Sequence, residues 1–126
     1  MIVDSSAGGL LRRARGGGDP RAARGVRPKR ISSVNWLECA IELDNAAPAA
    51  ALELDAFLEE TGIVVAPATP SQARAARLAY RRFGKGRHPA RLNLGDCFAY
   101  ALARETGEPL LCKGNDFAAT DLALVR

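Results

Sequence analysis

Four acidic residues lie where a carboxylate is expected to face the interior of the fold. Asp4 follows a short apolar run, and Glu38 lies along the apolar face of a predicted helix. Asp96 falls in the first turn of a second predicted helix, and Asp116 follows another apolar run. Carboxylates without matching bases favour a hard divalent cation such as Mg²⁺ or Mn²⁺, which takes oxygen ligands and keeps several waters. Such a cation indicates chemistry on phosphate esters, because it activates water and neutralises developing charge.

The elements that must position these acids alternate between strands and helices. We expect strands at 1–3, 63–65, 109–112 and 122–125, and helices at 33–45, 48–61, 70–83 and 94–106. This alternation predicts a single α/β domain with a central parallel sheet covered on both faces. Ligands of open parallel sheets bind beyond the carboxyl ends of the strands. Acids carried by four different elements can therefore converge on one pocket at that edge.

Local patterns add detail to three of these elements. The β-branched run at 63–65 predicts a buried strand. Thr69 and Gln72 have the spacing of a capping box at the start of the 70–83 helix. The buried face of the 33–45 helix is predicted from apolar residues at helical spacing, with Glu38 along the same face; these residues are Val34, Leu37 and Ile41.

Length and composition indicate one ordinary globular domain. The chain has 126 residues, of which 48% are hydrophobic and 25% charged. No run reaches the roughly 20 apolar residues that cross a bilayer, and no signal peptide is recognised, so we expect a cytoplasmic protein without a membrane partner. Three cysteines without metal-ligand spacing favour neither a disulfide framework nor a zinc site. Cys39, Cys97 and Cys112 are predicted to pack as small apolar side chains.

Positive charge is concentrated in one segment. Residues 8–30 hold eight basic residues and one acid, a net +7, and the rest holds ten basic and 13 acidic residues, a net −3. The segment is rich in Gly, Arg and Pro and has no helical or strand period, so alone it reads as a basic loop. A second basic cluster, predicted to contact phosphates, surrounds the loop at 84–91: Arg81, Arg82, Lys85, Arg87, His88 and Arg91. A solvated face, or a site for an acidic partner segment, explains that cluster equally well.

Four motifs together resemble the PIN-domain family, and more narrowly its VapC-type toxins. They are IVDSSA at 2–7, SSVNWLECAIEL at 32–43, AYRRFGKGRHPARLNLGDCFAYALA at 79–103 and PLLCKGNDFAATDLALV at 109–125. The resemblance implies a PIN-like three-layer α/β/α fold in one domain over 1–126. It also implies an endoribonuclease that depends on Mg²⁺ or Mn²⁺, and a homodimer neutralised by a cognate VapB-type antitoxin.

The resemblance also assigns roles to individual residues. Asp4, Glu38 and Asp96 match the three best-defined acids of the family. Many relatives have Asp where this chain has Gly114, so Asp116 is the nearest fourth acid, with Asp121 as the alternative. In the implied mechanism Asp4, Asp96 and Asp116 hold the metal, and Glu38 positions or deprotonates the attacking water. Two further residues resemble polar groups lining such pockets, although each also suits a plain turn: Ser6 and Asn115.

Residues 8–30 are the main departure from the family. Relatives continue here into an amphipathic helix and a second short helix, whereas this chain is aperiodic. A shifted reading frame and a diverged basic loop both account for the change. The segment also motivates a second function: a catalytically decayed remnant that binds antitoxin or RNA without cleavage. A receiver-like α/β domain is disfavoured, because the first strand lacks an adjacent acidic pair.

Overall fold

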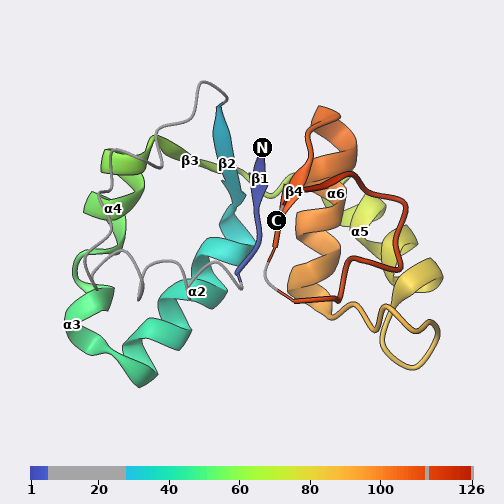
Figure 1. The fold of residues 1–126 in the computed structure, drawn as a ribbon, viewed down its shortest axis with the longest axis horizontal. Helices are drawn as coiled ribbons and strands as arrows, with labels where there is room; N and C mark the ends of the chain where they lie inside the picture. The colour runs from blue at the N-terminus through green and yellow to red at the C-terminus, as the bar shows by residue number, and fades with distance from the viewer. Residues whose placement is uncertain (6–27, 113, 126) are drawn as a thin grey trace.

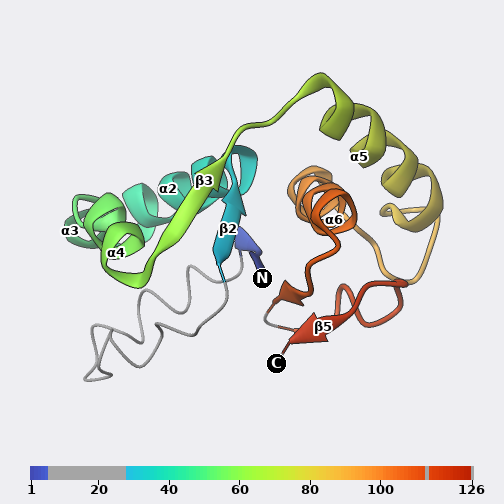
Figure 2. The same ribbon diagram turned by 90° about the horizontal axis from the view of Figure 1, so that it is seen from above.

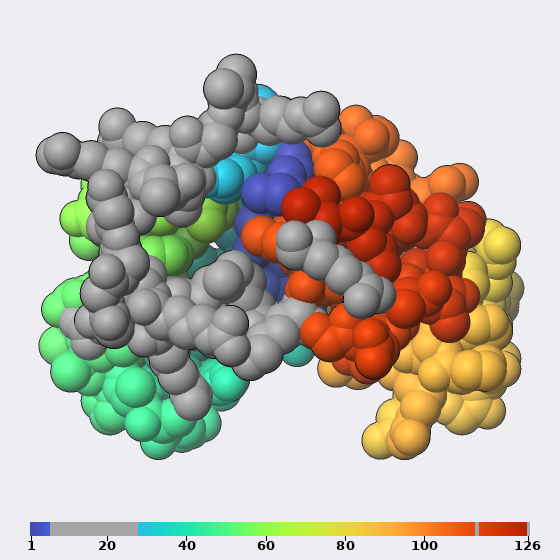
Figure 3. Space-filling view, viewed as in Figure 1, coloured from blue at the N-terminus to red at the C-terminus, as the bar shows by residue number. Residues whose placement is uncertain are grey.

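The computed structural model describes residues 1–5, 28–112 and 114–125, so residues 8–27 of the basic segment and Ser6 lie outside it. A parallel sheet forms its centre, with the strand order β3-β2-β1-β4-β5. The described strands are β1 (Ile2–Val3), β2 (Lys29–Ser32), β3 (Ile63–Ala66), β4 (Leu110–Leu111) and β5 (Leu124–Val125). Figure 3 shows the N-terminal residues between β2 and the C-terminal part of the chain, as this order requires.

Helices cover the sheet on two sides, which confirms the predicted three-layer α/β/α class. The described helices are α2 (Ser33–Ala46), α3 (Pro48–Ala51), α4 (Leu54–Thr61), α5 (Pro70–Phe83) and α6 (Leu94–Thr106). Figures 1 and 2 place α2, α3 and α4 on one side and α5 and α6 on the other. The single helix expected at 48–61 is divided, because Leu52 and Glu53 form a turn between α3 and α4.

The two faces of the sheet belong to separate apolar clusters, since neighbouring residues of a strand point to opposite faces. Ile2 and Leu110 are fully buried in the core that contains α5 and α6. Val3 and Ile31 are buried on the other face, against Trp36 of α2. Each side of the two-residue strand β1 is therefore fixed by packing, and Asp4 is the next residue along the chain.

Strand β2 was not predicted, and it occupies the place beside β1. Lys29 and Arg30, which end the basic segment, begin this strand. Its neighbours are β1 on one side and β3 on the other, with Arg30 opposite Ile2 and Val64. Only Ile31 among its four residues is a large apolar group, so the sequence pattern was too weak to reveal it. Backbone hydrogen bonds to β1 and β3 hold this strand in the sheet, although its side chains bury little apolar surface.

Two predictions of buried residues were wrong, one in β3 and one in α2. Val64 and Val65 are 62% and 39% exposed, because β3 is an edge strand and α6 packs over β1, β2 and β4 instead. In α2, Leu37 and Ile41 are 52% and 51% exposed. The buried residues of α2 are Asn35, Cys39 and Leu43, and the last two pack against α3 and α4. Apolar residues surround most of this helix, so periodicity alone selected the wrong face.

The helix ends follow the sequence signals with one exception. Ser32, Thr69 and Asn93 cap α2, α5 and α6, and Gly62 ends α4 with φ +71°. Thr69 Oγ1 accepts a hydrogen bond from the Gln72 backbone N–H at 3.1 Å. The Gln72 side chain instead donates to Glu105 of α6 at 2.7 Å, so the predicted capping box is only half formed. Gln72 therefore joins two helices.

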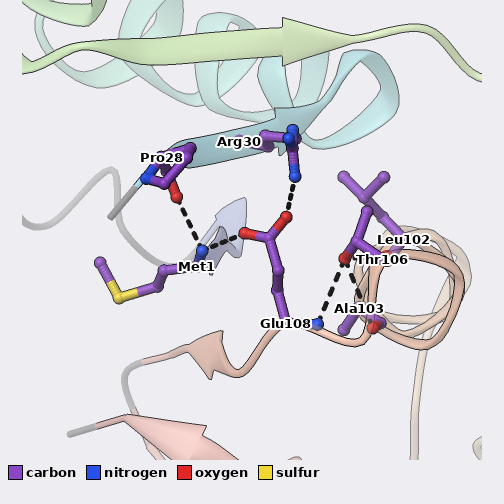
Figure 4. Close-up of polar contacts among 7 residues, drawn as sticks. All are labelled: Met1, Pro28, Arg30, Leu102, Ala103, Thr106 and Glu108. Carbon is purple, nitrogen blue, oxygen red and sulfur yellow. Dashed lines mark hydrogen bonds and ion pairs between the residues drawn. The ribbon is translucent and has the colours of Figure 1, made fainter. Parts of the chain in front are cut away.

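A charged cluster joins the amino ends of β1, β2 and β4 (Figure 4). The amino group of Met1 contacts Glu108 and the Pro28 carbonyl, and Arg30 pairs with the same Glu108 carboxylate. This cluster stands at the edge of the sheet opposite to Asp4. Cys39 and Cys97 are buried thiols within the apolar clusters, and Cys112 packs partly buried against the core. In the described ranges, no helix has the length and apolar character needed to span a membrane.

Candidate active site

The candidate site lies at the carboxyl edge of the sheet, where α2 and α6 both begin (Figure 1). Asp4 follows β1 directly and is 3% exposed. Asp96 stands in the first turn of α6 and is 7% exposed. Glu38 lies half-buried one turn into α2, and Asp116 lies exposed beyond β4. The acids thus arrive from four elements, as the parallel topology predicted.

Asp96 is held by the start of its own helix. Its Oδ2 accepts a hydrogen bond from the Asn93 backbone N–H at 2.9 Å, and Asn93 Oδ1 accepts from the Asp96 backbone N–H at 2.9 Å. This reciprocal capping box fixes the carboxylate at the start of its own helix. Asp96 therefore also has a structural role at the start of α6, and this role orients its carboxylate.

The pKa shifts of Asp96 and Glu38 indicate that the acids lie near one another. The pKa of Asp96 is raised to about 6, chiefly by burial; the Asn93 hydrogen bond lowers it, and the charges of Asp4, Asp116 and Glu38 add smaller increases. Burial also raises the pKa of Glu38, with Asp4 as the next contribution. Like charges disfavour one another's ionised forms, so these shifts register a cluster of carboxylates.

Asn35 orients Glu38 from the preceding turn of α2. Asn35 is fully buried, and its Nδ2 donates to Glu38 Oε1 at 3.2 Å and to the Gly95 carbonyl of α6 at 3.0 Å. The amide orientation follows from its partners, because a flipped group would set its oxygen against two acceptors. One side chain of α2 thereby links Glu38 to the beginning of α6.

Two residues of this site were missed in the sequence. Asn35 precedes Glu38 by three residues, a spacing that brings side chains together on a helix, and this was the available signal. Ser5 donates to Asp4 Oδ1 at 3.4 Å and also hydrogen-bonds Glu38, which lowers the pKa of Glu38. Ser5 directly follows Asp4, whereas the role was predicted for Ser6, which lies outside the described residues.

The choice between Asp116 and Asp121 as fourth acid is clarified by their contacts. Asp116 contributes to the raised pKa of Asp96. Asp121 accepts from the Tyr100 hydroxyl at 2.6 Å and pairs with Arg82 at 3.2 Å, so its charge is directed toward α5 and α6. The hydrogen bond from Tyr100 lowers the pKa of Asp121. Asn115 is exposed beside Asp116. Asp121 thus has the contacts of a structural anchor.

The donor chemistry suits a hard cation: the site offers carboxylate oxygens, and two of the carboxylates are nearly buried. Within residues 1–5, 28–112 and 114–125, however, no group of three or more His, Cys, Asp or Glu side chains is placed to hold a metal ion. Mg²⁺ commonly uses one or two carboxylates and keeps several waters, so a looser arrangement still fits it. Asp4, Asp96 and Asp116 are the residues that would hold it.

In the predicted phosphate-contacting cluster, some side chains contact other residues of the protein and others are exposed. Arg82 pairs with Asp121 and lies over the Phe83 ring at 4.6 Å from its centroid. His88 Nδ1 accepts from the Ala90 backbone N–H at 3.0 Å, and its ring meets Phe83 edge-on at 5.0 Å. His88 therefore also organises the loop. Arg81, Lys85, Arg87 and Arg91 are exposed, and Arg87 lies over the Tyr80 ring at 5.8 Å from its centroid.

Comparison with known proteins assigns the family. The PIN-domain model matches residues 12–122, which is most of the chain. This protein is a PIN domain of the VapC type. Ribonuclease VapC28 of Mycobacterium tuberculosis is 48% identical over 126 residues, covering 95% of this chain and 93% of the relative. Ribonuclease VapC42 of the same species is 43% identical over 126 residues, covering 97% and 96%.

Solved structures share the fold of this PIN domain. The crystal structure of Mycobacterium tuberculosis VapC20, a Sarcin-Ricin loop cleaving toxin, matches with a TM-score of 0.72 at 20% identity, covering 99% of this chain and 98% of the other. A toxin–antitoxin complex from Klebsiella pneumoniae matches with a TM-score of 0.67 at 15% identity, covering 98% and 95%. At these identities the likeness shows the fold alone, and it agrees with the observed parallel sheet.

Proposed function

We propose that this PIN domain is a metal-dependent endoribonuclease toxin that hydrolyses RNA phosphodiester bonds. The observation that carries the proposal is the placement of buried Asp4 and Asp96 at the carboxyl edge of the sheet, with Glu38 and Asp116 near enough for their charges to contribute to the raised pKa of Asp96. Relatives at 43–48% identity that are named ribonucleases support it. Since all four acids are present, cleavage is favoured over the alternative of a remnant that only binds.

In the proposed reaction Glu38 accepts a proton from the attacking water. Its pKa is raised by burial and by Asp4, which makes its carboxylate a stronger base than an exposed one. The water oxygen bonds to phosphorus, the bond to the leaving oxygen breaks, and that oxygen takes up a proton from solvent, to which Glu38 releases the proton it accepted. Asp4, Asp96 and Asp116 would hold Mg²⁺ or Mn²⁺. When bound, such a cation stabilises the charge on the phosphate and lowers the pKa of coordinated water.

The proposed partners follow from the same assignment. The exposed side chains Lys85, Arg87 and Arg91 lie in the loop that leads to α6, where they suit contacts with the RNA backbone. A cognate VapB-type antitoxin would neutralise the toxin, and the structural match to a toxin–antitoxin complex is consistent with such a partner. We further propose a homodimer that acts in the cytoplasm.

Cleavage of cellular RNA by the purified, folded protein tests this function. A pool of structured RNAs is incubated with the protein and Mg²⁺, Mn²⁺ or EDTA, and the fragments are mapped. We expect discrete cuts with either cation and none with EDTA. If the RNA stays intact under all conditions while circular dichroism shows that the protein is folded, the nuclease function is refuted. The alternative, a remnant that binds antitoxin or RNA without cleavage, would then be favoured.

A further inference from the structure

Gly95 leaves the space in which the Glu38 carboxylate lies. A Cβ built on Gly95 would overlap the Glu38 carboxyl group, with Oε2, the farthest of its three atoms, 2.5 Å away. Carbon and oxygen atoms that are not bonded approach no closer than about 3 Å, so α6 and this carboxylate meet here only because residue 95 lacks a side chain. The contact joins the turn that carries Asp96 to the side chain of Glu38.

The backbone gives Gly95 no other reason to be glycine. It lies inside α6 and is absent from the residues with positive φ, so alanine fits its conformation. Alanine is also the better helix former. Gly84 provides the contrast, because a Cβ there would meet the Tyr80 backbone carbonyl as well as its ring, with ring atom Cδ2 at 2.7 Å. At Gly95 the obstructing group is the far end of the Glu38 side chain, so the contact falls on a carboxyl group and not on backbone.

Asn35 closes the same arrangement from α2. Its single amide holds both Glu38 Oε1 and the Gly95 carbonyl, and it is fully buried. The carboxylate therefore has a hydrogen-bond donor on one side and the open Cα of Gly95 on another. Together these contacts hold the Glu38 carboxylate next to the start of α6.

We propose that Gly95 and Asn35 are positioning residues that set Glu38 against the Asp96 turn for the reaction. Neither residue touches the substrate; both act through Glu38. The proposal rests on the proposed nuclease function, and it adds the requirement that position 95 lack a side chain. It predicts that adding one methyl group at position 95 lowers activity without lowering the stability of the fold.

The first test is Gly95→Ala, with Gly84→Ala as the matched control. Gly95→Ala should keep or raise the melting temperature, whereas Gly84→Ala should lower it. Gly95→Ala should also lower kcat by about 10- to 100-fold, the loss associated with a misplacement of about 1 Å, with little change in KM. A Gly95→Ala protein with wild-type kcat would overturn the proposal, and so would one that is as destabilised as Gly84→Ala.

A double-mutant cycle tests whether the effect passes through Glu38. Glu38→Asp shortens the side chain and withdraws the carboxylate from position 95. In that background, adding Gly95→Ala should change kcat by less than about two-fold, because nothing remains to be displaced. An equal loss in both backgrounds would show that Gly95→Ala acts by another route and would overturn the proposal.

The side-chain amide of Asn35 gives a readout that does not need activity. Its ¹⁵N-resolved proton pair should exchange slowly with water in the wild type and shift in Gly95→Ala, and the shift should be smaller in the Glu38→Asp background. Asn45→Ala, an exposed change at the end of α2, should leave that signal in place. If the wild type cuts no RNA, the proposed function fails, and this amide signal still decides the positioning claim. An unchanged signal in Gly95→Ala would refute it.

Discussion

Replacing Asp96 by Asn should stabilise the metal-free protein near neutral pH while it abolishes cleavage. The fold raises the pKa of Asp96 from 3.8 to about 6, so ionising this residue in the folded state costs roughly two pKa units. At about 1.4 kcal/mol per unit, the penalty is about 3 kcal/mol. The charge also complements the first turn of α6, which offsets about 0.3–1 kcal/mol. Asp96→Asn keeps the acceptor for the Asn93 N–H and should gain about 2 kcal/mol.

The assay is thermal denaturation in EDTA near pH 7, followed by circular dichroism. A gain of 2 kcal/mol corresponds to about 6–10 °C for a domain of this size. Asp55→Asn is the matched control, because Asp55 is an exposed acid in the first turn of α4. It loses a favourable helix-dipole interaction without relieving burial, so its melting temperature should stay equal or fall. An Asp96→Asn protein less stable than the wild type in EDTA would refute the reasoning.

Three further predictions follow from the same contacts. The metal-free wild type should gain about 1 kcal/mol as pH falls from 7 to 5. A folded pKa of about 6 for Asp96, above an unfolded 3.8, gives stability that is present below about pH 4 and lost as pH rises through 6. Denaturant titrations at both pH values measure this, with Asp96→Asn as the reference that lacks this titration, and an equal gain in both proteins would contradict it. Mn²⁺ in excess of EDTA should raise the melting temperature of the wild type but not of Asp4→Asn, since a ligand of the folded state stabilises it by mass action. Equal increases in melting temperature for both proteins would mean that the cation binds elsewhere. Tyr100→Phe should lower the free energy of unfolding by about 1 kcal/mol, because it removes the 2.6 Å hydrogen bond to Asp121. The variant should retain cleavage. A loss of cleavage in a variant that remains folded would give Asp121 a role in the pocket.

The parts of the fold that were predictable are those encoded by local chemistry. Thr69 and Asn93 cap the starts of α5 and α6, and Gly62 caps the end of α4, because caps depend on residues a few positions apart. The parallel sheet followed from alternation of strands and helices. Strand β2 could not be read in this way, because its pairing with β1 and β3 is a property of the tertiary fold.

The site was predictable as a set of acids but not as a geometry. Asp4 and Asp96 were found from their places beside a strand and in a helix, and they are buried at the sheet edge. Asn35 of α2 and Gly95 of α6 are 60 residues apart in the chain, and they meet only through the contact between these two helices. No local pattern marks such a contact, and the wrong assignment of the α2 face concealed the buried Asn35. Long-range packing therefore determines how Glu38 is oriented.

The most direct test of the central claim is the rate at which one RNA, chosen from the cleaved pool, is cut in a single turnover with Mg²⁺. Wild type is compared with Asp4→Asn, which removes one charge at the 3% exposed position, and with Asp44→Asn, an exposed change on α2. The account predicts that Asp4→Asn loses cleavage by at least about 100-fold while remaining folded, and that Asp44→Asn cuts at the wild-type rate. Equal rates for the wild type and Asp4→Asn would contradict a nuclease site built from these acids.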